Sequence, residues 1–169
     1  ATEIRVENGT FVFNLQHPKG TLSDVEVGLP GIHNIENAIA AFAVASELGI
    51  ASDKIILALA SFKGVKRRFE YHIKSNELVY IDDYAHHPEE LKACIRSVRE
   101  LYPDRKITGI FQPHLYSRTR DFADAFAESL SELNEVILLE IYPARELPIE
   151  GVSSAMLLEK ISISKKSLL

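Results

Sequence analysis

The first third of the chain alternates between apolar and polar residues and then changes to a helical pattern. The alternation over residues 4–15 is centred on Asn8-Gly9, a dipeptide that readily takes the positive φ angles of a tight turn, so it predicts a β-hairpin. A third strand is expected near residues 25–29. Apolar residues at helical spacing then predict two helices, over residues 34–48 and 52–62.

Strands and helices alternate in the rest of the chain. The pattern predicts strands over residues 69–73, 78–81, 106–111 and 136–141, and helices over residues 88–101, 117–133 and 153–161. Such alternation favours a parallel sheet with right-handed crossovers. The predicted fold class is therefore α/β, a Rossmann-like and mostly parallel sheet with flanking helices, preceded by the hairpin and its two helices.

A basic segment separates the two patterns. Residues 63–68 contain a glycine and four cations, and the helical pattern stops there. We therefore expect one domain over residues 1–63 and a second over residues 64–169.

In a parallel sheet the loops that leave the carboxyl ends of the strands gather at one edge, where ligands bind. Three such loops are expected to converge, over residues 82–87, 112–118 and 142–146.

Charge and composition exclude several classes of partner. Nineteen Lys and Arg against 24 Asp and Glu give a net charge of −5, which disfavours nucleic acid or an anionic membrane as a partner. No apolar run is long enough to cross a bilayer. A single cysteine, Cys94, and the lack of a signal-like opening favour the cytoplasm. Because the chain opens with Ala-Thr-Glu rather than Met, we expect it to be a piece of a longer protein.

The first loop, residues 82–87, holds two carboxylates, a phenol and two imidazoles before a helix begins. This composition suits an anionic ligand or the hydroxyl groups of a sugar. The alternative is structural, with Asp82 and Asp83 closing strand ends and His86 and His87 capping the helix. A transition-metal site is a further alternative, but adjacent histidines point in different directions, and we predict no metal ligands in this chain.

The second loop and its helix carry His114, Tyr116, Arg118 and Arg120. A helix start favours acids, so guanidinium groups there indicate a function other than helix stability. An arginine fork fits a carboxylate or phosphate through two parallel hydrogen bonds. The alternative is a surface ion pair with Asp121 or Asp124.

Two nucleotide-binding motifs are absent from the sequence. There is no G-x-x-x-x-G-K-[ST] phosphate loop and no G-x-G-x-x-G. The chain is therefore not a complete P-loop NTPase. Asn37, however, lies inside a predicted helix, where an amide is mildly unfavourable, so a hydrogen-bonding partner is plausible there.

Three ordered motifs resemble the Mur ligase family. They are Gly-Ile-His-Asn-Ile-Glu-Asn at residues 31–37, Arg-Arg-Phe-Glu at 67–70 and Asp-Asp-Tyr-Ala-His-His-Pro at 82–88. Within the family, Phe-Gln-Pro-His at 111–114 with Tyr-Ser-Arg-Thr-Arg at 116–120 is most similar to the members that add L-alanine to UDP-N-acetylmuramic acid. The resemblance covers nearly the whole chain.

The resemblance implies an ATP-dependent ligase that makes an amide through an acyl phosphate in the synthesis of peptidoglycan precursors. Residues 1–63 would end the central ATP-binding domain, and residues 64–169 would form most of the third domain. The N-terminal and central domains are then missing partners, which would supply the P-loop and the ligands of Mg²⁺. Alone, the fragment would be inactive.

The resemblance also implies roles for individual residues. Asn37 with His33 or Asn34 would contact adenine, Arg68 and Asp83 the ATP phosphates or ribose, and Tyr84 would lie beside the nucleotide. His86 and Arg118 would hold L-alanine, with His114, Tyr116 and Arg120 also at the substrate. Relatives often have Arg where this chain has Leu115, so part of the carboxylate clamp would either be absent here or be supplied by Arg120 or Arg145.

Other functions remain open on the sequence. A stand-alone Rossmann-like module that binds an anionic small molecule or a protein tail would need no phosphate loop. The sibling Mur ligase that reattaches recycled peptide shares the Asp-Tyr/Phe-Ala-His-His-Pro type of loop. A metal hydrolase built on the Asp/His loop is the third alternative.

Overall fold

The computed structural model describes residues 1–7 and 9–169, so Asn8 of the predicted turn lies outside the described residues. The chain packs as two units, Ala1–Tyr84 and Ala85–Leu169. The predicted domain boundary between residues 63 and 64 stays a prediction. Within the described residues, no helix is both long and apolar enough to cross a membrane.

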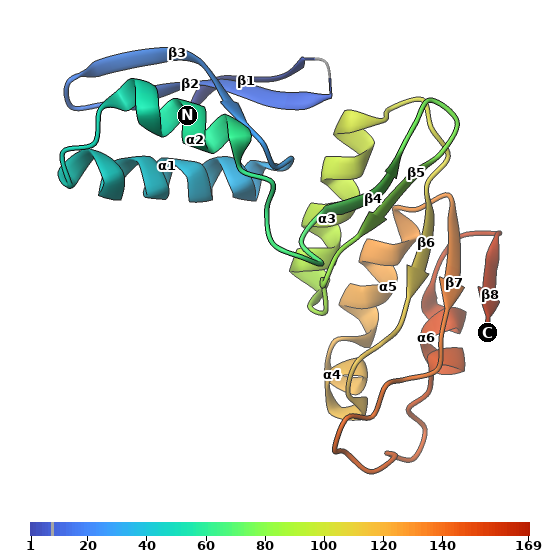
Figure 1. Ribbon diagram of the computed structural model, residues 1–169. Helices are drawn as coiled ribbons and strands as arrows, with labels where there is room; N and C mark the ends of the chain where they lie inside the picture. The colour runs from blue at the N-terminus through green and yellow to red at the C-terminus, as the bar shows by residue number, and fades with distance from the viewer. Residues whose placement is uncertain (8) are drawn as a thin grey trace. The chain divides into compact units, whose positions relative to one another are not determined.

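The first unit contains a three-stranded antiparallel sheet covered on one face by two helices (Figure 1). Its elements are β1 (Thr2–Glu7), β2 (Thr10–His17), β3 (Gly20–Val27), α1 (Ile32–Glu47) and α2 (Ser52–Ser61). Phe13 of β2 and Ile35 and Phe42 of α1 are almost fully buried, which explains the apolar stripe of α1. The two predicted helices and the strands on either side of the predicted turn are confirmed, whereas the third strand runs from Gly20 to Val27 rather than over residues 25–29. Gly49 ends α1 with φ of 80°, a value that favours glycine.

A two-stranded antiparallel hairpin completes the first unit, formed by β4 (Glu70–Lys74) and β5 (Val79–Asp82). Ser75 closes its turn, because its backbone N–H and its hydroxyl both donate to the carbonyl of Leu78. A connection this short can join only antiparallel strands. Among the described residues, β5 is not part of the parallel sheet β6-β7-β8, so placing residues 78–81 at the start of the parallel alternation was wrong.

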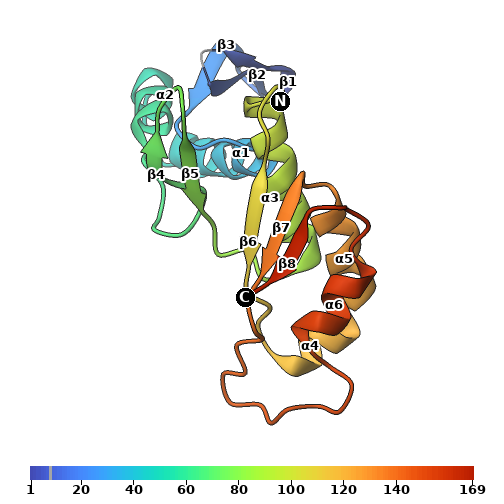
Figure 2. The same cartoon turned by 90° about the vertical axis from the view of Figure 1, so that its right-hand side faces the viewer.

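The second unit is a parallel sheet, in the order β6-β7-β8, with helices packed against it (Figure 2). Its elements are α3 (Pro88–Leu101), β6 (Thr108–Phe111), α4 (Tyr116–Asp121), α5 (Ala123–Ser131), β7 (Glu135–Leu138), α6 (Ser154–Lys160) and β8 (Lys166–Leu168). Phe126 and Leu130 of α5 pack with Val136 and Leu138 of β7 in the core. The predicted α/β class is confirmed. The three-residue strand β8 was not predicted.

The single helix predicted over residues 117–133 is instead two helices, α4 and α5, separated at Phe122. Phe122 has φ of −116° and ψ of 17°, and its ring packs edge to face against His87 at 4.8 Å between centroids. The apolar stripe runs through both helices, so the pattern could not reveal the break. The packing against His87 explains where it falls.

Candidate functional site

The second and third predicted loops meet at the carboxyl ends of β6 and β7. His114 and Tyr142 form an isolated parallel bridge, and their rings stack at 5.4 Å between centroids. The Leu115 N–H donates to the Tyr142 carbonyl at 3.0 Å, and the Tyr142 N–H donates to the Pro113 carbonyl at 2.8 Å. The predicted convergence of these two loops is therefore confirmed.

Glu146 ties the third loop to the start of α4. Its carboxylate accepts from the Ser117 backbone N–H at 2.9 Å and from the Ser117 hydroxyl at 2.5 Å. These two bonds, together with the Tyr116 backbone N–H and the charge of Arg118, lower the pKa of Glu146 and outweigh its desolvation. The carboxylate is therefore ionised near neutral pH and fixes the backbone next to Arg118.

Arg118 and His114 form the polar centre of these loops. Arg118 Nη1 lies 3.4 Å from Nδ1 of His114, and since a guanidinium only donates, Nδ1 is the acceptor. Burial lowers the pKa of His114, and the charges of Arg118 and His86 lower it further, while Glu146 opposes the change. His114 therefore stays neutral to lower pH than an ordinary histidine. His86, which belongs to the same unit, lies close enough for its charge to act on His114.

The first loop is organised by the start of α3. His87 is the N-cap residue, and Glu90 closes a capping box by accepting from the backbone N–H of His87 at 3.2 Å. Glu90 also accepts from the His86 N–H at 3.0 Å and lies 3.3 Å from His86 Nδ1. Desolvation acts to raise the pKa of Glu90, but the bonds and charges of His86 and His87 outweigh it and lower the pKa. The capping alternative is thus correct for His87.

The two predicted arginines of α4 have different surroundings. Arg120 is exposed and pairs with its neighbour Asp121 at 2.7 Å, so the surface ion pair is the correct interpretation for this residue. Arg118 is half-buried and faces His114 instead. Arg145 is exposed on the third loop, and Tyr116 is half-buried at the first position of α4. Arg118 is therefore the better placed of the two to hold an anion in a fixed geometry.

The residues predicted to meet adenine lie together at the start of α1. Asn34 donates to the Pro30 carbonyl at 2.6 Å, and this bond fixes the entry to the helix. Asn37, one turn further on, is exposed and donates to Asn34 Oδ1 at the long distance of 3.5 Å. His33 is also exposed. Asn34 is thus partly explained by local structure, whereas Asn37 presents its amide on the surface of the helix.

The residues predicted to meet the rest of the nucleotide surround the start and end of the hairpin. Asp83 Oδ2 accepts from the Phe69 N–H at 2.8 Å, and the Tyr84 N–H donates to the Arg67 carbonyl at 2.7 Å. Arg67 also lies over the Tyr84 ring, 4.9 Å from its centroid. Arg68 is exposed. One oxygen of Asp83 therefore has a structural role.

Sequence reasoning missed the residues that hold the loops in place. Glu90, Ser117, Glu146 and Tyr142 organise His86, Arg118 and His114, but the sequence patterns gave none of them a role in holding these loops, and Glu90 was expected only to mark the start of the helix. Glu90 follows His87 by three residues, which is the spacing of a capping box and a usable signal. The contact between Ser117 and Glu146 spans 29 residues and leaves no such signal.

The fold and these loops define an α/β unit whose strand ends gather two imidazoles and one guanidinium. The chain belongs to the Mur ligase family: the family model described as "Mur ligase, glutamate ligase domain" matches residues 67–167. A UDP-N-acetylmuramate–L-alanine ligase from Flavobacterium johnsoniae is 56% identical over 96% of this chain and 36% of its own length. The chain spans about a third of the length of the curated relatives it matches.

Solved structures support the same fold. The UDP-N-acetylmuramate–alanine ligase of Thermotoga maritima superposes with a TM-score of 0.81 and 25% identity, over 98% of this chain and 36% of that one. The folylpolyglutamate synthase of Mycobacterium tuberculosis complexed with ADP superposes with a TM-score of 0.76 and 20% identity, over 99% of this chain and 36% of that one. At this identity the second likeness concerns the fold alone.

Proposed function

We propose that this chain is part of a ligase that uses ATP to join L-alanine to the lactyl carboxylate of UDP-N-acetylmuramic acid, within the cytoplasm. Two observations support the proposal: the 56% identity to a relative of that name, and the half-buried Arg118, whose Nη1 lies 3.4 Å from His114 Nδ1. The second is the observation that carries the assignment of the site, because the fork of a half-buried guanidinium can donate two parallel hydrogen bonds to the carboxylate of an amino acid.

The amino acid binds at the loops of the second unit in this proposal. Arg118 holds the carboxylate of L-alanine through its fork, with Tyr116 and the more exposed Arg120 nearby, and His86 lies beside it. His114 is kept neutral by its lowered pKa, and because its Nδ1 accepts from Arg118, its Nε2–H is left to donate to a carboxylate oxygen of L-alanine. Glu146 and Glu90 act through the backbone, since they hold α4 and the His86 segment in position.

The nucleotide binds at residues of the first unit. Asn37, with His33 or Asn34, contacts adenine, and Arg68, Asp83 and Tyr84 contact the phosphates or ribose. ATP supplies the phosphoryl group that activates the lactyl carboxylate as an acyl phosphate. The amine of alanine then forms the C–N bond, the C–O bond to phosphate breaks, and inorganic phosphate leaves with its electron pair. The nitrogen gives up a proton in this step.

Mg²⁺ does not fit the loops of the second unit. Arg118 and two histidines gather there, whereas Mg²⁺ prefers carboxylate, carbonyl and water oxygens. We assign its ligands to the missing part of the protein. What this chain contributes is positioning, charge and exclusion of water around a labile acyl phosphate, which are the main requirements of phosphoryl transfer.

The test is a substrate-omission assay on the full-length protein that contains this segment. Release of ADP should require both UDP-N-acetylmuramic acid and L-alanine, and mass spectrometry should detect the alanyl product. Turnover with a recycled tripeptide in place of L-alanine would contradict the proposal and favour the sibling ligase. Absence of turnover with either substrate, from protein that binds ATP, would also contradict it.

A further inference from the structure

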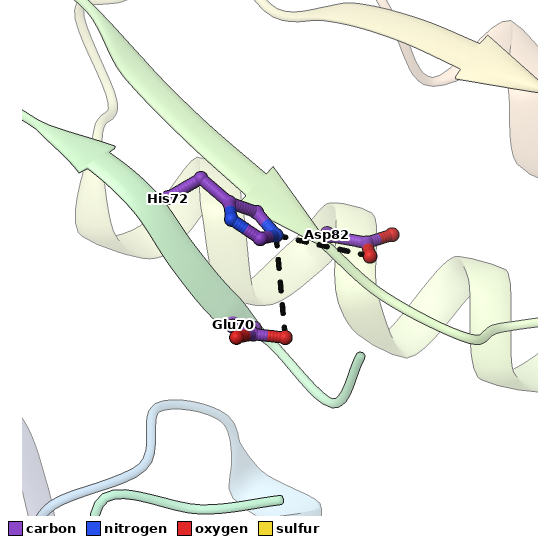
Figure 3. Close-up of side chains that lie close together, drawn as sticks. All are labelled: Glu70, His72 and Asp82. Carbon is purple, nitrogen blue, oxygen red and sulfur yellow. Dashed lines mark ion pairs between the residues drawn. The ribbon is translucent and has the colours of Figure 1, made fainter. Parts of the chain in front are cut away.

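A second cluster of ionisable side chains lies on the β4–β5 hairpin of the first unit and includes Asp82, the last residue of β5, whereas Arg118 and His114 belong to the second unit. Figure 3 shows Glu70 and His72 of β4 and Asp82 of β5 directed toward one another. His72 Nε2 lies 4.0 Å from Glu70 Oε2 and 3.9 Å from Asp82 Oδ2. One ligand atom of each residue lies within 4.8 Å of the others. Three groups able to bind a metal are thus gathered at one point.

The strand register explains why these three side chains share a face. Glu70 pairs directly with Asp82, and paired residues of antiparallel strands point to the same side. The register then shifts between Tyr71 and Ile73, so His72 is the extra residue of a β-bulge. Bulges redirect a side chain and are frequent next to functional sites. Here the bulge directs the imidazole toward the carboxylate pair.

Neighbouring side chains fix the imidazole and limit the charge. The ring of His72 stacks on Tyr80, with 5.0 Å between centroids, and this contact orients Nε2. Arg67 Nε lies 3.5 Å from Asp82 Oδ2, while its backbone N–H donates to Glu70 Oε2 at 2.8 Å. The guanidinium has a second contact, the Tyr84 ring, so it can leave Asp82 and still be packed.

We propose that Glu70, His72 and Asp82 bind a divalent transition-metal ion of the zinc type, contrary to the expectation from the sequence that this chain holds no metal ligands. Like charges directly across two strands destabilise a hairpin, and a cation between them reverses that effect. An imidazole with two carboxylates is a donor set for zinc rather than for Mg²⁺ or Ca²⁺. Bond lengths of 2.0–2.2 Å place tetrahedral ligand atoms about 3.4 Å apart, so rotations of the side chains suffice to close the site.

The metal-site proposal does not rest on the proposed ligase activity. Metal binding can be measured on the 169-residue chain itself, prepared without an affinity tag. Isothermal titration with Zn²⁺ should show one site of micromolar affinity, and Co²⁺ should give visible d–d absorption at the same stoichiometry. H72Q, E70Q and D82N should each weaken Zn²⁺ binding by at least about tenfold, because even supporting residues of metal sites cost that much.

Two further variants test whether Zn²⁺ binds at Glu70, His72 and Asp82 rather than at any exposed histidine. H33Q makes the same substitution at an exposed histidine of α1 and should leave the affinity unchanged. R67Q removes the competing cation and should tighten binding about fivefold. Circular dichroism of each variant checks that the fold is intact.

Paramagnetic broadening of amide signals by Co²⁺ locates the ion without any substitution. Signals of residues 70–72 and 80–82 should broaden first. Three results would overturn the proposal: no stoichiometric Zn²⁺ binding below millimolar concentration, retained affinity in both H72Q and E70Q, or broadening centred on His86 and His114.

Discussion

The loops around Arg118 and the β4–β5 hairpin both place histidine next to carboxylates and an arginine, but the backbone uses the carboxylates differently. In the loops, Glu90 and Glu146 accept from backbone N–H groups at the starts of α3 and α4. Imidazole and guanidinium groups are left to meet a ligand. On the hairpin, Glu70 and Asp82 face each other across the strands and converge on His72. The same residue types therefore favour an anion in one place and a cation in the other.

The largest expected effect comes from removing the guanidinium of the loops. In the full-length enzyme, Arg118→Ala should raise KM for L-alanine about 100-fold, because two charge-assisted hydrogen bonds to the carboxylate are lost. KM for ATP should change far less. Steady-state kinetics with each substrate varied in turn measure both values.

Arg120→Ala is the matched control for Arg118→Ala, since it removes the same charge from a position two residues further along α4. Arg120 is exposed and paired with Asp121, so its loss should change KM for L-alanine no more than about threefold. Equal increases in KM for L-alanine and for ATP in Arg118→Ala would count against the assigned role of Arg118.

The start of α3 and the β4–β5 hairpin should also differ in how much stability each loses when one of its carboxylates is removed. Glu90→Ala removes the acceptor of the capping box and should lower the local stability of α3 by about 1 kcal/mol. Asp82→Asn removes one of two opposed charges and an exposed ion pair, so the stability of the hairpin should change by less than about 0.5 kcal/mol. Amide hydrogen exchange reports each element separately. Greater loss in the hairpin than in α3 would reverse the comparison.

The smallest effect is on the titration of His114. Its imidazole should titrate below the ordinary value of 6.5, since burial and then the charges of Arg118 and His86 lower its pKa. Arg118→Gln should raise this pKa and Glu146→Gln should lower it, because the two neighbours act with opposite sign. Nuclear magnetic resonance of the imidazole protons measures both shifts.

The lowered pKa of His114 also sets the direction of a stability change. The unfolded chain binds a proton at His114 more readily than the folded chain does. The stability that neutral His114 contributes to the folded state is therefore complete above pH 6.5. It is lost as the pH falls through the lowered pKa that His114 has in the folded state. His114→Gln should remove that part of the acid sensitivity. An unchanged dependence of stability on pH below 6.5 would contradict the assigned shift.

Local patterns predicted the elements better than the contacts between them. The helix over residues 88–101 was predicted at its observed bounds, because Pro88 and two glutamates mark its start and an apolar stripe runs along it. The break at Phe122 and the pairing of β5 were missed, since both depend on packing and on strand partners rather than on periodicity.

The candidate site was predicted only as far as residue types allow. His86, His114 and Arg118 were expected together, and the second unit brings them together. The sequence could not separate Arg118 from Arg120, because only the fold pairs Arg120 with Asp121. Glu70 and His72, two residues apart on a predicted strand, were a readable sign of a shared face, but the position of Asp82 depends on the cross-strand register.

The central claim is that the guanidinium of Arg118 receives the carboxylate of L-alanine. A crystal structure of the full-length enzyme with ADP and the alanyl product tests it most directly, through the distance between that guanidinium and the alanyl carboxylate. The account predicts two N–H to O contacts of about 2.8 Å. A carboxylate held by other residues, with Arg118 turned away from it, would contradict the account.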